Sequence, residues 1–463
     1  AARALLVRPG PPTGAQPHPP GSKYYTLRYV LAAALATGAS VVRNPAHSDD
    51  TDVLLAAVRA LGAAAEWDGA ATLRLRGCGG RPQPPLGGTL DAGNAGAVLR
   101  LLLGIGALLP EVRFTTPYPE SLGRRPNADL LAALGALGIA WEARGPDGRL
   151  PITLRGGPPR GGAVQVSGAR SSQYLSALLY LAPLLPDGLR ISVTDDLRSA
   201  PLVRATLRAL ARAGIAMSAA DDLRAFTIPG GQSYRAGTYG VPGDSPSAAA
   251  LVGAALALGA PLRLAGLDPA EDDVRGLLTA LAALGVDLSP QPPPQRGAGE
   301  PDVPLPGGEG GERVLLLAPP LPRTGEGAGG WEAVVDGDAC TDSVPALVAI
   351  ACFAHGTTRF ERVGTLRLKE SDRIGDLCAE LGRAGCDLHA EADAIVVRGQ
   401  SAGIPGGVTV SAHQDHRLAQ ALAIAALHSR VGLTITGAEH VAKSYPRFFD
   451  DLAAMGAVVE AVK

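Results

Sequence analysis

The amino-acid sequence predicts an α/β fold made of six copies of one unit, each with two helices and several short strands. Two helical patterns alternate along the 463 residues, and each of them occurs six times. Short segments rich in strand-forming residues lie between the helices. No G-x-G-x-x-G motif follows a strand, which argues against a doubly wound nucleotide-binding fold.

The first helical pattern is an apolar helix that ends in Ala-Leu-Gly or a similar sequence, followed by a short strand. Glycine is expected there because it adopts the left-handed conformation that stops a helix. The intervals between successive glycines are 76, 76, 71, 100 and 71 residues. The six helix-ending glycines are Gly62, Gly138, Gly214, Gly285, Gly385 and Gly456.

The second helical pattern is apolar on nearly all sides, so its helices are expected to be buried. Its copies span residues 26–40, 95–110, 172–188, 247–260, 344–357 and 416–430. Strands are expected within the β-rich segments 71–77, 163–168, 189–195, 224–230 and 394–399.

One interval is longer than the others, which indicates an insertion in the fourth unit. Residues 289–314 and 319–332 are dominated by Pro, Gly and charged residues, so we expect mobile surface loops there. Such a loop can act as a lid over a site, or it can be a tolerated surface insertion. The second interpretation is favoured, because exposed polar loops accept insertions readily.

Composition argues against one class of protein and predicts the make-up of the core. The net charge is -2, which argues against a globally basic nucleic-acid binder. Apolar residues make up 46% of the chain but aromatic residues only 4%, so the core is expected to consist of Ala, Leu and Val.

The cysteines and the apolar runs indicate the cellular location. The cysteines are scattered and odd in number, which favours a reducing compartment over a disulfide framework or a zinc site. They are Cys78, Cys340, Cys352, Cys378 and Cys386. The first twenty residues lack the apolar segment of a signal peptide, and the longest apolar runs are too short to span a membrane. We therefore expect a soluble, cytoplasmic protein.

Polar motifs are concentrated where the apolar helices of the second pattern begin. Such motifs are GSKYYTLR, DAGNAGAVLR, SGARSSQYL, CTDSVPAL and HQDHRLAQ, with TLRLKESDR and AKSYPRFFDD flanking further helices. Helix N-termini attract anions, so these motifs predict anion binding. The Gly-Ser-Lys turn at Lys23 is not a nucleotide P-loop, because the G-x-x-x-x-G-K-[ST] spacing is missing.

Six motifs together resemble the 5-enolpyruvylshikimate-3-phosphate (EPSP) synthases of the enolpyruvyl transferase family. In chain order they read GNAG, RPNADL, SSQYL, LKESDR, DHR and KSYPRFFDDL. The resemblance covers the chain apart from the N-terminal tail and the insertion. It implies two similar globular domains, each of three βαβαββ repeats, in an inside-out α/β barrel-like arrangement. The implied domains are residues 22–241 and residues 1–21 plus 242–463, with the insertion at about 289–331.

The resemblance also implies a reaction. Members of the family transfer the enolpyruvyl group of phosphoenolpyruvate to the 5-hydroxyl of shikimate 3-phosphate and release phosphate by addition and elimination. This step belongs to chorismate and aromatic amino acid biosynthesis and requires no metal or organic cofactor. The two anionic substrates are bound in a cleft that closes over them. We expect a monomer that binds neither nucleic acid nor membrane.

Residues that match the family motifs are the candidates for catalysis and binding. The predicted catalytic residues are Lys23, Asp342 and Glu370. The predicted ligands of shikimate 3-phosphate are Lys23, Tyr24, Arg28, Ser171, Ser172, Gln173, Ser199, Asp342 and Lys369. The predicted ligands of phosphoenolpyruvate are Lys23, Asn94, Gly96, Arg125, Gln173, Arg373, His416, Arg417 and Lys443. Arginine suits the phosphate and the carboxylate of this substrate because its planar fork binds both bidentately.

Several of these residues also have a purely structural interpretation. A lone Asp before an apolar helix, such as Asp342, is more often an N-cap, and a Ser pair such as Ser171 and Ser172 is often just a cap. Glu370, next to a Lys and close to an Asp, is typical of a solvated face. Arg100 either supports the Gly96 loop or forms a structural ion pair, and Asp415 is expected to orient the DHR segment.

Four positions depart from the family pattern. Tyr24 replaces a serine that contacts the shikimate carboxylate, and Leu202 and Thr365 replace a tyrosine and an asparagine. Ala97 replaces the threonine after GNAG, where it could alter sensitivity to glyphosate, the family inhibitor that occupies the phosphoenolpyruvate pocket. Tyr24 and Leu202 are interpreted as a compensated swap, in which the larger side chain at position 24 is offset by the smaller one at position 202 and the acceptor stays the same. This interpretation is favoured because exchanges that conserve side-chain volume are tolerated best. The alternative is a different acceptor.

Three functions therefore remain open on the sequence. The first is transfer to shikimate 3-phosphate. The second is enolpyruvyl transfer to UDP-N-acetylglucosamine or a cyclitol. The third is a non-catalytic binding protein on the same scaffold. The intact lysine, carboxylates and arginines argue against the third.

Overall fold

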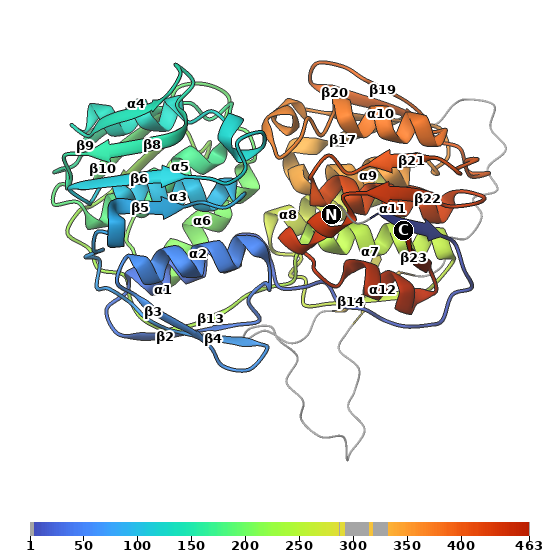
Figure 1. The fold of residues 1–463 in the computed structure, drawn as a ribbon, viewed down its shortest axis with the longest axis horizontal. Coiled ribbons are helices and arrows are strands. Elements are labelled where there is room, and N and C mark those ends of the chain that lie inside the picture. The colour runs from blue at the N-terminus through green and yellow to red at the C-terminus, as the bar shows by residue number, and fades with distance from the viewer. Residues whose placement is uncertain (1–3, 287, 292–313, 318–331, 463) are drawn as a thin grey trace, which may run out of the picture. The chain divides into compact units, whose positions relative to one another are not determined.

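The computed structural model describes residues 4–286, 288–291, 314–317 and 332–462. The chain divides into two compact units, shown in Figure 1. One consists of Gly21–Val241 and is called the contiguous unit. The other combines Ala1–Pro20 with Pro242–Lys463 and is called the split unit.

The contiguous unit contains three helix pairs and three sheets. Its α-helices are α1 (Lys23–Leu35), α2 (Asp49–Ala60), α3 (Gly96–Gly106), α4 (Ala128–Ala136), α5 (Ser172–Leu181) and α6 (Ala200–Arg212). Its strands are β2 (Ala39–Arg43), β3 (Ala64–Trp67), β4 (Thr72–Arg76), β5 (Thr89–Asp91), β6 (Glu111–Thr115), β7 (Ala140–Arg144), β8 (Arg149–Arg155), β9 (Gly162–Val166), β10 (Leu189–Val193), β11 (Ser218–Ala219), β12 (Ala225–Ile228) and β13 (Thr238–Gly240). Short 3-10 turns are η1 (Leu86–Gly88), η2 (Leu122–Arg124) and η3 (Ala182–Leu184).

The split unit repeats this plan within its described residues. Its α-helices are α7 (Ser245–Leu258), α8 (Asp272–Ala283), α9 (Val344–Ala351), α10 (Gly375–Ala384), α11 (His416–His428) and α12 (Phe448–Met455). Its strands are β1 (Ala4–Arg8), β14 (Leu262–Ala265), β15 (Leu288–Gln291), β16 (Val314–Leu317), β17 (Glu332–Asp336), β18 (Thr357–Glu361), β19 (Asp387–Ala390), β20 (Ala394–Arg398), β21 (Thr409–Ser411), β22 (Leu433–Thr436) and β23 (Val458–Val462). Its 3-10 turns are η4 (Gly337–Ser343), η5 (Gly364–Leu368) and η6 (Ala438–Lys443).

Each repeat folds into one small sheet. In the second repeat the sheet order is β5-β6-β8-β7, with β5 parallel to β6 and the remaining pairs antiparallel. The chain order β5-α3-β6-α4-β7-β8 is the predicted βαβαββ unit. The other sheets are β13-β2-β4-β3, β11-β12-β10-β9, β14-β16-β15, β17-β18-β20-β19 and β21-β22-β1-β23. The predicted α/β fold of repeated units is therefore confirmed.

The six predicted helix-ending glycines all adopt the left-handed conformation. Their φ angles lie between 78° at Gly214 and 117° at Gly456. A side chain would be strained at such angles, so glycine is required where each outer helix turns into its strand. This local requirement explains why the repeat is readable in the sequence.

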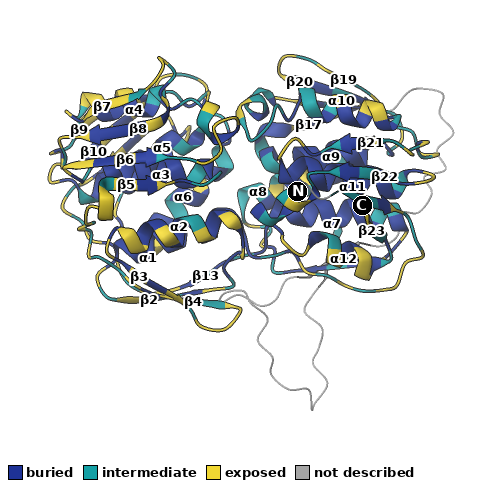
Figure 2. Ribbon diagram, in the orientation of Figure 1, coloured by how far each residue is buried: buried dark blue, intermediate teal, exposed yellow. Residues whose placement is uncertain are grey.

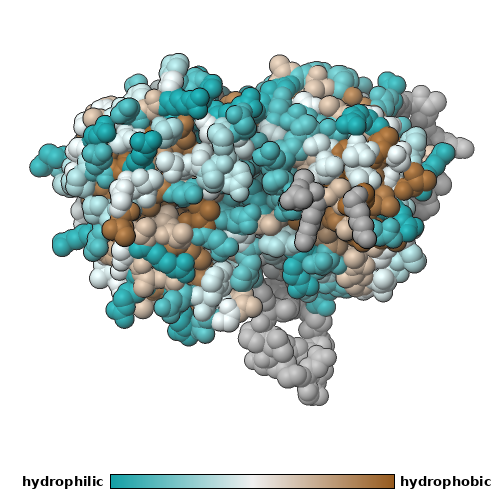
Figure 3. Space-filling view, viewed as in Figure 1, coloured by the Kyte–Doolittle hydropathy of each residue, from teal (hydrophilic) through white to brown (hydrophobic). Residues whose placement is uncertain are grey.

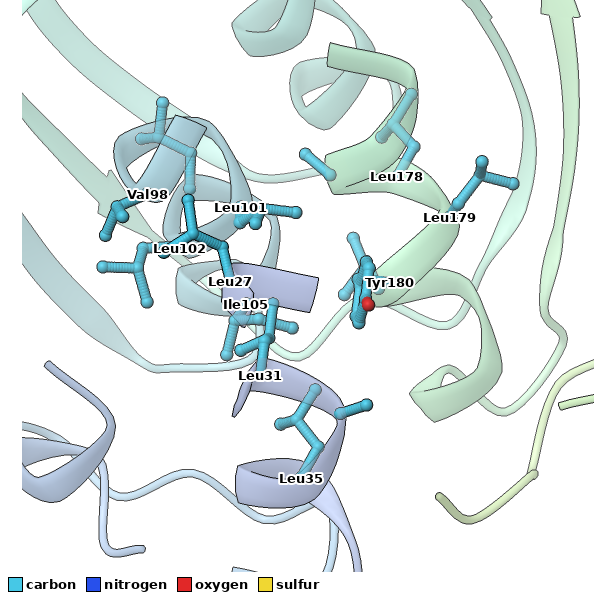
Figure 4. Close-up of a cluster of buried hydrophobic side chains, with 14 of the residues drawn as sticks. Leu27, Leu31, Leu35, Val98, Leu101, Leu102, Ile105, Leu178, Leu179 and Tyr180 are labelled. Atoms are coloured by element: carbon cyan, nitrogen blue, oxygen red, sulfur yellow. The ribbon is translucent and has the colours of Figure 1, made fainter. Parts of the chain in front are cut away.

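The second helical pattern forms the buried cores of both units, as Figure 2 shows. All thirteen residues of α1 are buried, and in the contiguous unit α1, α3 and α5 bring their leucines together (Figure 4). Small residues let the helices approach closely. A Cβ added at Gly104 of α3 would lie 2.5 Å from the carbonyl oxygen of Ala177 in α5. The low aromatic content of the sequence therefore suits closely packed helices.

One expectation from the sequence needs correction. Residues 289–314 were expected to be surface loop, but their described ends belong to strands: β15 (Leu288–Gln291) and β16 (Val314–Leu317) pair with each other, and β16 pairs with β14. Residues 292–313 and 318–331 lie outside the described residues. The N-terminal tail, which the resemblance left out, supplies β1 as an inner strand between β22 and β23.

The visible surface mixes hydrophilic and apolar residues over both units (Figure 3). The exposed large apolar side chains of the described residues lie on separate elements, at Leu86, Tyr118, Trp141, Val334, Leu368, Val431 and Val462. Single exposures of this kind are normal. None of the described helices is both long enough and apolar enough to cross a lipid bilayer.

Candidate active site

In the contiguous unit, side chains from the first two turns of α1, α5 and α6 are in contact, and α3 is joined to α5 through the carbonyl of Pro126. Arg28 of α1 donates from Nε to Thr206 Oγ1 of α6 at 2.8 Å, and Thr206 Oγ1 lies 2.8 Å from Ser176 Oγ of α5. Arg100 of α3 and Tyr174 of α5 both donate to the carbonyl oxygen of Pro126. Predicted site residues lie at the starts of these helices, at Lys23, Gly96, Ser172 and Ser199. The partial positive charge of several helix N-termini favours an anion there.

Lys23 begins α1 directly after Ser22, whose side chain accepts a hydrogen bond from the Tyr25 amide and caps the helix. Its Nζ lies 3.2 Å from Asp50 Oδ2 at the start of α2, and both side chains are buried. A buried lysine requires such a partner, because an isolated charge is costly to remove from water. Asp50 was not predicted from the sequence, where the run DDTD indicates only the start of a helix.

Arg125 packs directly against Gly96, the first residue of α3. A Cβ at Gly96 would lie 2.2 Å from Arg125 Nη1 and 2.6 Å from Arg100 Nη1. A side chain at this position would therefore displace these two guanidinium groups.

A set of backbone contacts holds the loop that carries Arg125. Asn94 Oδ1 accepts from the Leu122 amide at 3.2 Å, and Asn127 Nδ2 donates to the Arg125 carbonyl at 3.1 Å. Arg100 donates to the carbonyl oxygens of Gly96 and Pro126, both at 3.1 Å. Arg100 therefore supports this loop, which is the first of the two roles that the sequence allowed for it, the other being a structural ion pair.

The predicted phosphate serines lie at two helix starts. Ser171 caps α5 by accepting from the Gln173 amide at 3.2 Å, so its structural interpretation is confirmed. Ser172 is buried in the first turn of α5, and Ser199 precedes α6 with a left-handed φ of 57°. The Oε1 of Gln173 is buried without a hydrogen-bond partner among the described residues. An unsatisfied buried acceptor at a helix start is consistent with a site that receives a donor from a ligand.

Arg28 makes protein contacts with all three guanidinium nitrogens. Besides its Nε contact to Thr206, its Nη1 donates to the Tyr24 carbonyl and its Nη2 to the Leu202 carbonyl, both at 3.0 Å. Arg28 thus joins α1 to α6 in this structure. It also links two of the four positions that depart from the family pattern, and the Tyr24 side chain beside it is buried.

In the split unit, Arg373 lies at the centre of a buried ion-pair network. Its Nη1 lies 2.7 Å from Asp342 Oδ1, its Nη2 lies 2.8 Å from Glu370 Oε2, and its Nε lies 2.7 Å from Asp415 Oδ2. Burial alone would lower the pKa of Arg373, but the charges of the three carboxylates raise it well above its ordinary value. Arg373 is therefore a permanent cation.

Two lysines complete this network. Lys369 Nζ lies 3.2 Å from Asp342 Oδ1, and Lys443 Nζ lies 3.0 Å from Glu370 Oε1. Both predicted catalytic carboxylates thus lie between two cations. The structural interpretations of Asp342 and Glu370 are wrong: Ser343, not Asp342, occupies the N-cap position of α9, and Glu370 is only 9% exposed.

The DHR segment starts α11 and supplies the remaining contacts. Asp415 caps the helix by accepting from the Arg417 amide, and it also accepts from Ser371 Oγ and Arg373. Asp415 therefore orients this segment, as predicted. Arg417 Nη2 lies 3.3 Å from Asp244 Oδ2, and the Asp244 side chain also caps α7. His416 is buried, with Nδ1 3.6 Å from Asp415 Oδ1.

The predicted residues thus form two clusters, one in each unit. The contiguous-unit cluster contains Lys23, Tyr24, Arg28, Asn94, Gly96, Arg125, Ser171, Ser172, Gln173 and Ser199. The split-unit cluster contains Asp342, Lys369, Glu370, Arg373, His416, Arg417 and Lys443. Sequence reasoning missed Asp50 and Asp244, which pair with a predicted lysine and arginine. Within the described residues, no group of three His, Cys, Asp or Glu side chains is arranged to hold a metal ion.

Solved structures of enolpyruvyl transferases share this fold. EPSP synthase from Acinetobacter baumannii superimposes with a TM-score of 0.76 at 24% identity, covering all of both chains. The enolpyruvyl transferase NikO from Streptomyces tendae gives a TM-score of 0.72 at 20% identity, covering 100% of this chain and 99% of that one. The chain thus has the fold of these enolpyruvyl transferases.

Sequence comparison identifies the particular family. A family model described as EPSP synthase (3-phosphoshikimate 1-carboxyvinyltransferase) matches residues 13–452. A 3-phosphoshikimate 1-carboxyvinyltransferase of Deinococcus radiodurans is 45% identical over 95% of this chain and 92% of that protein. The enzyme of the same name from Burkholderia pseudomallei is 32% identical over the same shares. The chain belongs to the EPSP synthase family.

Proposed function

We propose that this protein is a 3-phosphoshikimate 1-carboxyvinyltransferase. It transfers the enolpyruvyl group of phosphoenolpyruvate to the 5-hydroxyl of shikimate 3-phosphate and releases phosphate. The observation that carries the proposal is the family match over residues 13–452, which includes every candidate site residue. The buried network around Arg373 supports it, because it joins cations for anionic substrates to carboxylates for proton transfer.

In the split-unit cluster, the carboxylates are proposed to handle the substrate hydroxyls and the moving protons. Asp342 contacts the acceptor hydroxyls, and Glu370 transfers a proton at C3 of phosphoenolpyruvate. Both already lie within ion-pair distance of Arg373, with Lys369 beside Asp342 and Lys443 beside Glu370. These cations stabilise the charge that develops as the tetrahedral intermediate forms and collapses.

Binding is proposed to use the cations of both units. Arg125, Arg373, Arg417 and Lys443, with Asn94, Gly96, Gln173 and His416, hold phosphoenolpyruvate. Lys23 serves both substrates, and the remaining contacts to shikimate 3-phosphate come from Tyr24, Arg28, Ser171, Ser172, Gln173, Ser199, Asp342 and Lys369. The two compact units are the two domains of the enzyme.

Shikimate 3-phosphate is the acceptor that the names of the relatives favour over UDP-N-acetylglucosamine or a cyclitol. Arg28 binds the backbone carbonyls of both Tyr24 and Leu202, so the two departures lie close together, as a compensated swap requires. In this proposal the phenolic hydroxyl of Tyr24 replaces the serine hydroxyl of the family pattern.

The proposed location is the cytoplasm and the proposed state a monomer. All five cysteines are free thiols, which fits a reducing compartment. Size-exclusion chromatography with light scattering tests the monomer, and a dimer mass would contradict it.

Identification of the product tests the function. The protein is incubated with shikimate 3-phosphate and phosphoenolpyruvate labelled with carbon-13 at C3, and the mixture is followed by NMR. The expected result is a new vinyl ether on the 5-oxygen together with one inorganic phosphate per product. Unchanged substrates at enzyme concentrations that bind both of them would overturn the proposal.

A further inference from the structure

Two loops that lead to predicted phosphate serines lie side by side in the third repeat. One runs from β9 to α5 and the other from β10 to α6, and the two strands are parallel neighbours. Beyond the strands, the Thr194 amide donates to the Val166 carbonyl and the Arg198 amide to the Gly168 carbonyl, both at 3.1 Å. The loops therefore stay in contact up to the helix starts.

The side chain of Asp195 joins these loops. It belongs to the second loop, but its carboxylate accepts three hydrogen bonds from the first. Ser167 Oγ donates to Oδ2 at 2.6 Å, and the amides of Gly168 and Ala169 donate to Oδ1 at 2.7 and 3.0 Å. Hydrogen bonds to an ionised carboxylate are short and strong, so this contact fixes the first loop.

Close packing and a second anchor fix the other side of the contact. A Cβ at Gly168 would lie 2.9 Å from Leu197 Cα of the second loop and 2.8 Å from Val193 Cγ1 of β10, so only glycine fits here. Arg224, which precedes β12, donates to the Asp195 carbonyl at 2.9 Å. Asp195 is thus anchored near the sheet by its backbone carbonyl and to the first loop by its carboxylate.

Both loops end at serines of the contiguous-unit cluster. The first ends at Ser171 and Ser172, where α5 begins, and the second at Ser199, where α6 begins. The helices are joined further along by the contact between Ser176, one turn into α5, and Thr206, about two turns into α6. The helix bodies therefore have their own link, while the positions of the terminal serines depend on the loops.

We propose that Asp195 is a positioning residue that sets the spacing of Ser171, Ser172 and Ser199 and so tunes the affinity for the phosphate of shikimate 3-phosphate. This assignment rests on the proposed function, which names that substrate. Asp195 acts through the loops and not on the substrate, because its carboxylate is taken up by the three loop donors. Phosphoenolpyruvate, whose proposed ligands lie on other loops apart from Gln173, should be much less affected.

Three variants test the assignment. Asp195→Ala removes all three contacts, whereas Asp195→Asn keeps an oxygen that can accept from the two amides. Asp196→Asn is the matched control, because the neighbouring Asp196 is exposed and pairs with Arg198 at 2.9 Å instead of the first loop. Circular dichroism and the melting temperature confirm that each variant is folded.

The readout is the KM for each substrate and kcat, measured by phosphate release. For Asp195→Ala we expect the KM for shikimate 3-phosphate to rise about 10- to 100-fold, since small misplacements of binding groups have effects of this size. The KM of this variant for phosphoenolpyruvate should stay within about twofold, because most of the proposed ligands of phosphoenolpyruvate lie on loops that Asp195 does not contact. Asp195→Asn should recover most of the loss, and Asp196→Asn should match the wild type.

Two outcomes would overturn the assignment. The first is an unchanged KM for shikimate 3-phosphate in a folded Asp195→Ala protein. The second is an equal rise in both KM values, which would indicate general loosening of the unit. If the wild type releases no phosphate, the proposed function fails by itself, and calorimetric binding of shikimate 3-phosphate then decides the role of Asp195. Weaker binding by Asp195→Ala than by the wild type supports the role, and equal binding contradicts it.

Discussion

The two units present their polar residues in different ways. In the contiguous unit, Lys23 pairs with the single carboxylate of Asp50, and Arg125 lies on a loop whose backbone is held by Asn127. In the split unit, Arg373 alone pairs with three carboxylates, two of which also pair with a lysine. Backbone dipoles offer a fixed positive potential, whereas a network of paired charges can exchange partners and protons.

This difference suggests a division of labour. On the proposed function, the contiguous-unit cluster binds phosphate, and the split-unit cluster combines binding with proton transfer. The split-unit cations are already balanced by carboxylates, so an incoming anion must compete with Asp342 or Glu370 for Arg373. Substrate binding is then expected to release at least one of these carboxylates for the chemistry.

Replacing Arg373 should have the largest effect on stability. Arg373→Gln leaves the buried Asp415 and the largely buried Asp342 and Glu370 without their shared cation, so the free energy of unfolding should fall by about 3–5 kcal/mol. Urea denaturation followed by circular dichroism measures the change. The matched control is Arg359→Gln, because Arg359 also pairs with two carboxylates but is 38% exposed. Equal losses in the two variants would show that the split-unit network is no more costly to break than a surface pair.

The stability of the split unit should also depend on pH through His428. Burial lowers the pKa of His428 from its ordinary value near 6.5 to about 4, and its ring stacks on Phe353. Because the folded pKa lies below the unfolded one, the unfolded state binds the proton more readily. The contribution to stability is therefore complete above pH 6.5 and is lost as the pH falls toward 4.

Replacing the histidine measures this contribution. Between pH 7 and pH 4, wild type should lose about 3 kcal/mol more stability than His428→Gln, given the size of the pKa shift. Thermal unfolding at a series of pH values gives the difference between the two proteins. Parallel stability curves would contradict the assignment of His428 as a buried neutral ring.

Adding a single methyl group at Gly96 tests the contiguous-unit cluster. Gly96→Ala forces the guanidinium groups of Arg125 and Arg100 away from residue 96, so the KM for phosphoenolpyruvate should rise about 10- to 100-fold. Gly382→Ala is the control, because a Cβ there meets nothing within 4 Å. Steady-state kinetics with both substrates separate the two variants. An unchanged KM for phosphoenolpyruvate in Gly96→Ala would exclude Arg125 from its binding.

The smallest expected effect concerns the acceptor. If the Tyr24 hydroxyl replaces the family serine, Tyr24→Phe should raise the KM for shikimate 3-phosphate by about tenfold, the usual value of one hydrogen bond to a charged group. Tyr24→Ser should keep turnover, since it restores the family residue. Identical KM values for Tyr24→Phe and the wild type would show that the hydroxyl does not contact the acceptor.

The sequence predicted the features that depend on local patterns. The repeat was readable because each outer helix needs a glycine at its end, and the buried helices because they are apolar on all sides. The site residues were reached through motifs that surround helix starts. Each of these signals lies within about a dozen residues, which is the length over which a helix or turn places recognisable requirements on the residue types.

Contacts between distant segments could not be predicted in this way. The pairing of Arg417 with Asp244 joins residues 173 positions apart, and β1 pairs with strands near the other end of the chain. Asp195 gave no signal either, because an acid after a strand usually begins a turn. In each of these cases the partner is determined by tertiary packing, because the local sequence is compatible with several partners.

The most direct test of the account is phosphate release by the wild type and by one variant from each cluster. Lys23→Met represents the contiguous unit and Arg373→Gln the split unit. We expect the wild type to release phosphate only when shikimate 3-phosphate and phosphoenolpyruvate are both present. Each folded variant should lose at least about a hundredfold in rate, the usual effect of removing a group that stabilises transition-state charge. A wild type that releases no phosphate, or a variant from either cluster that retains the full rate, would contradict the claim that both clusters serve one reaction.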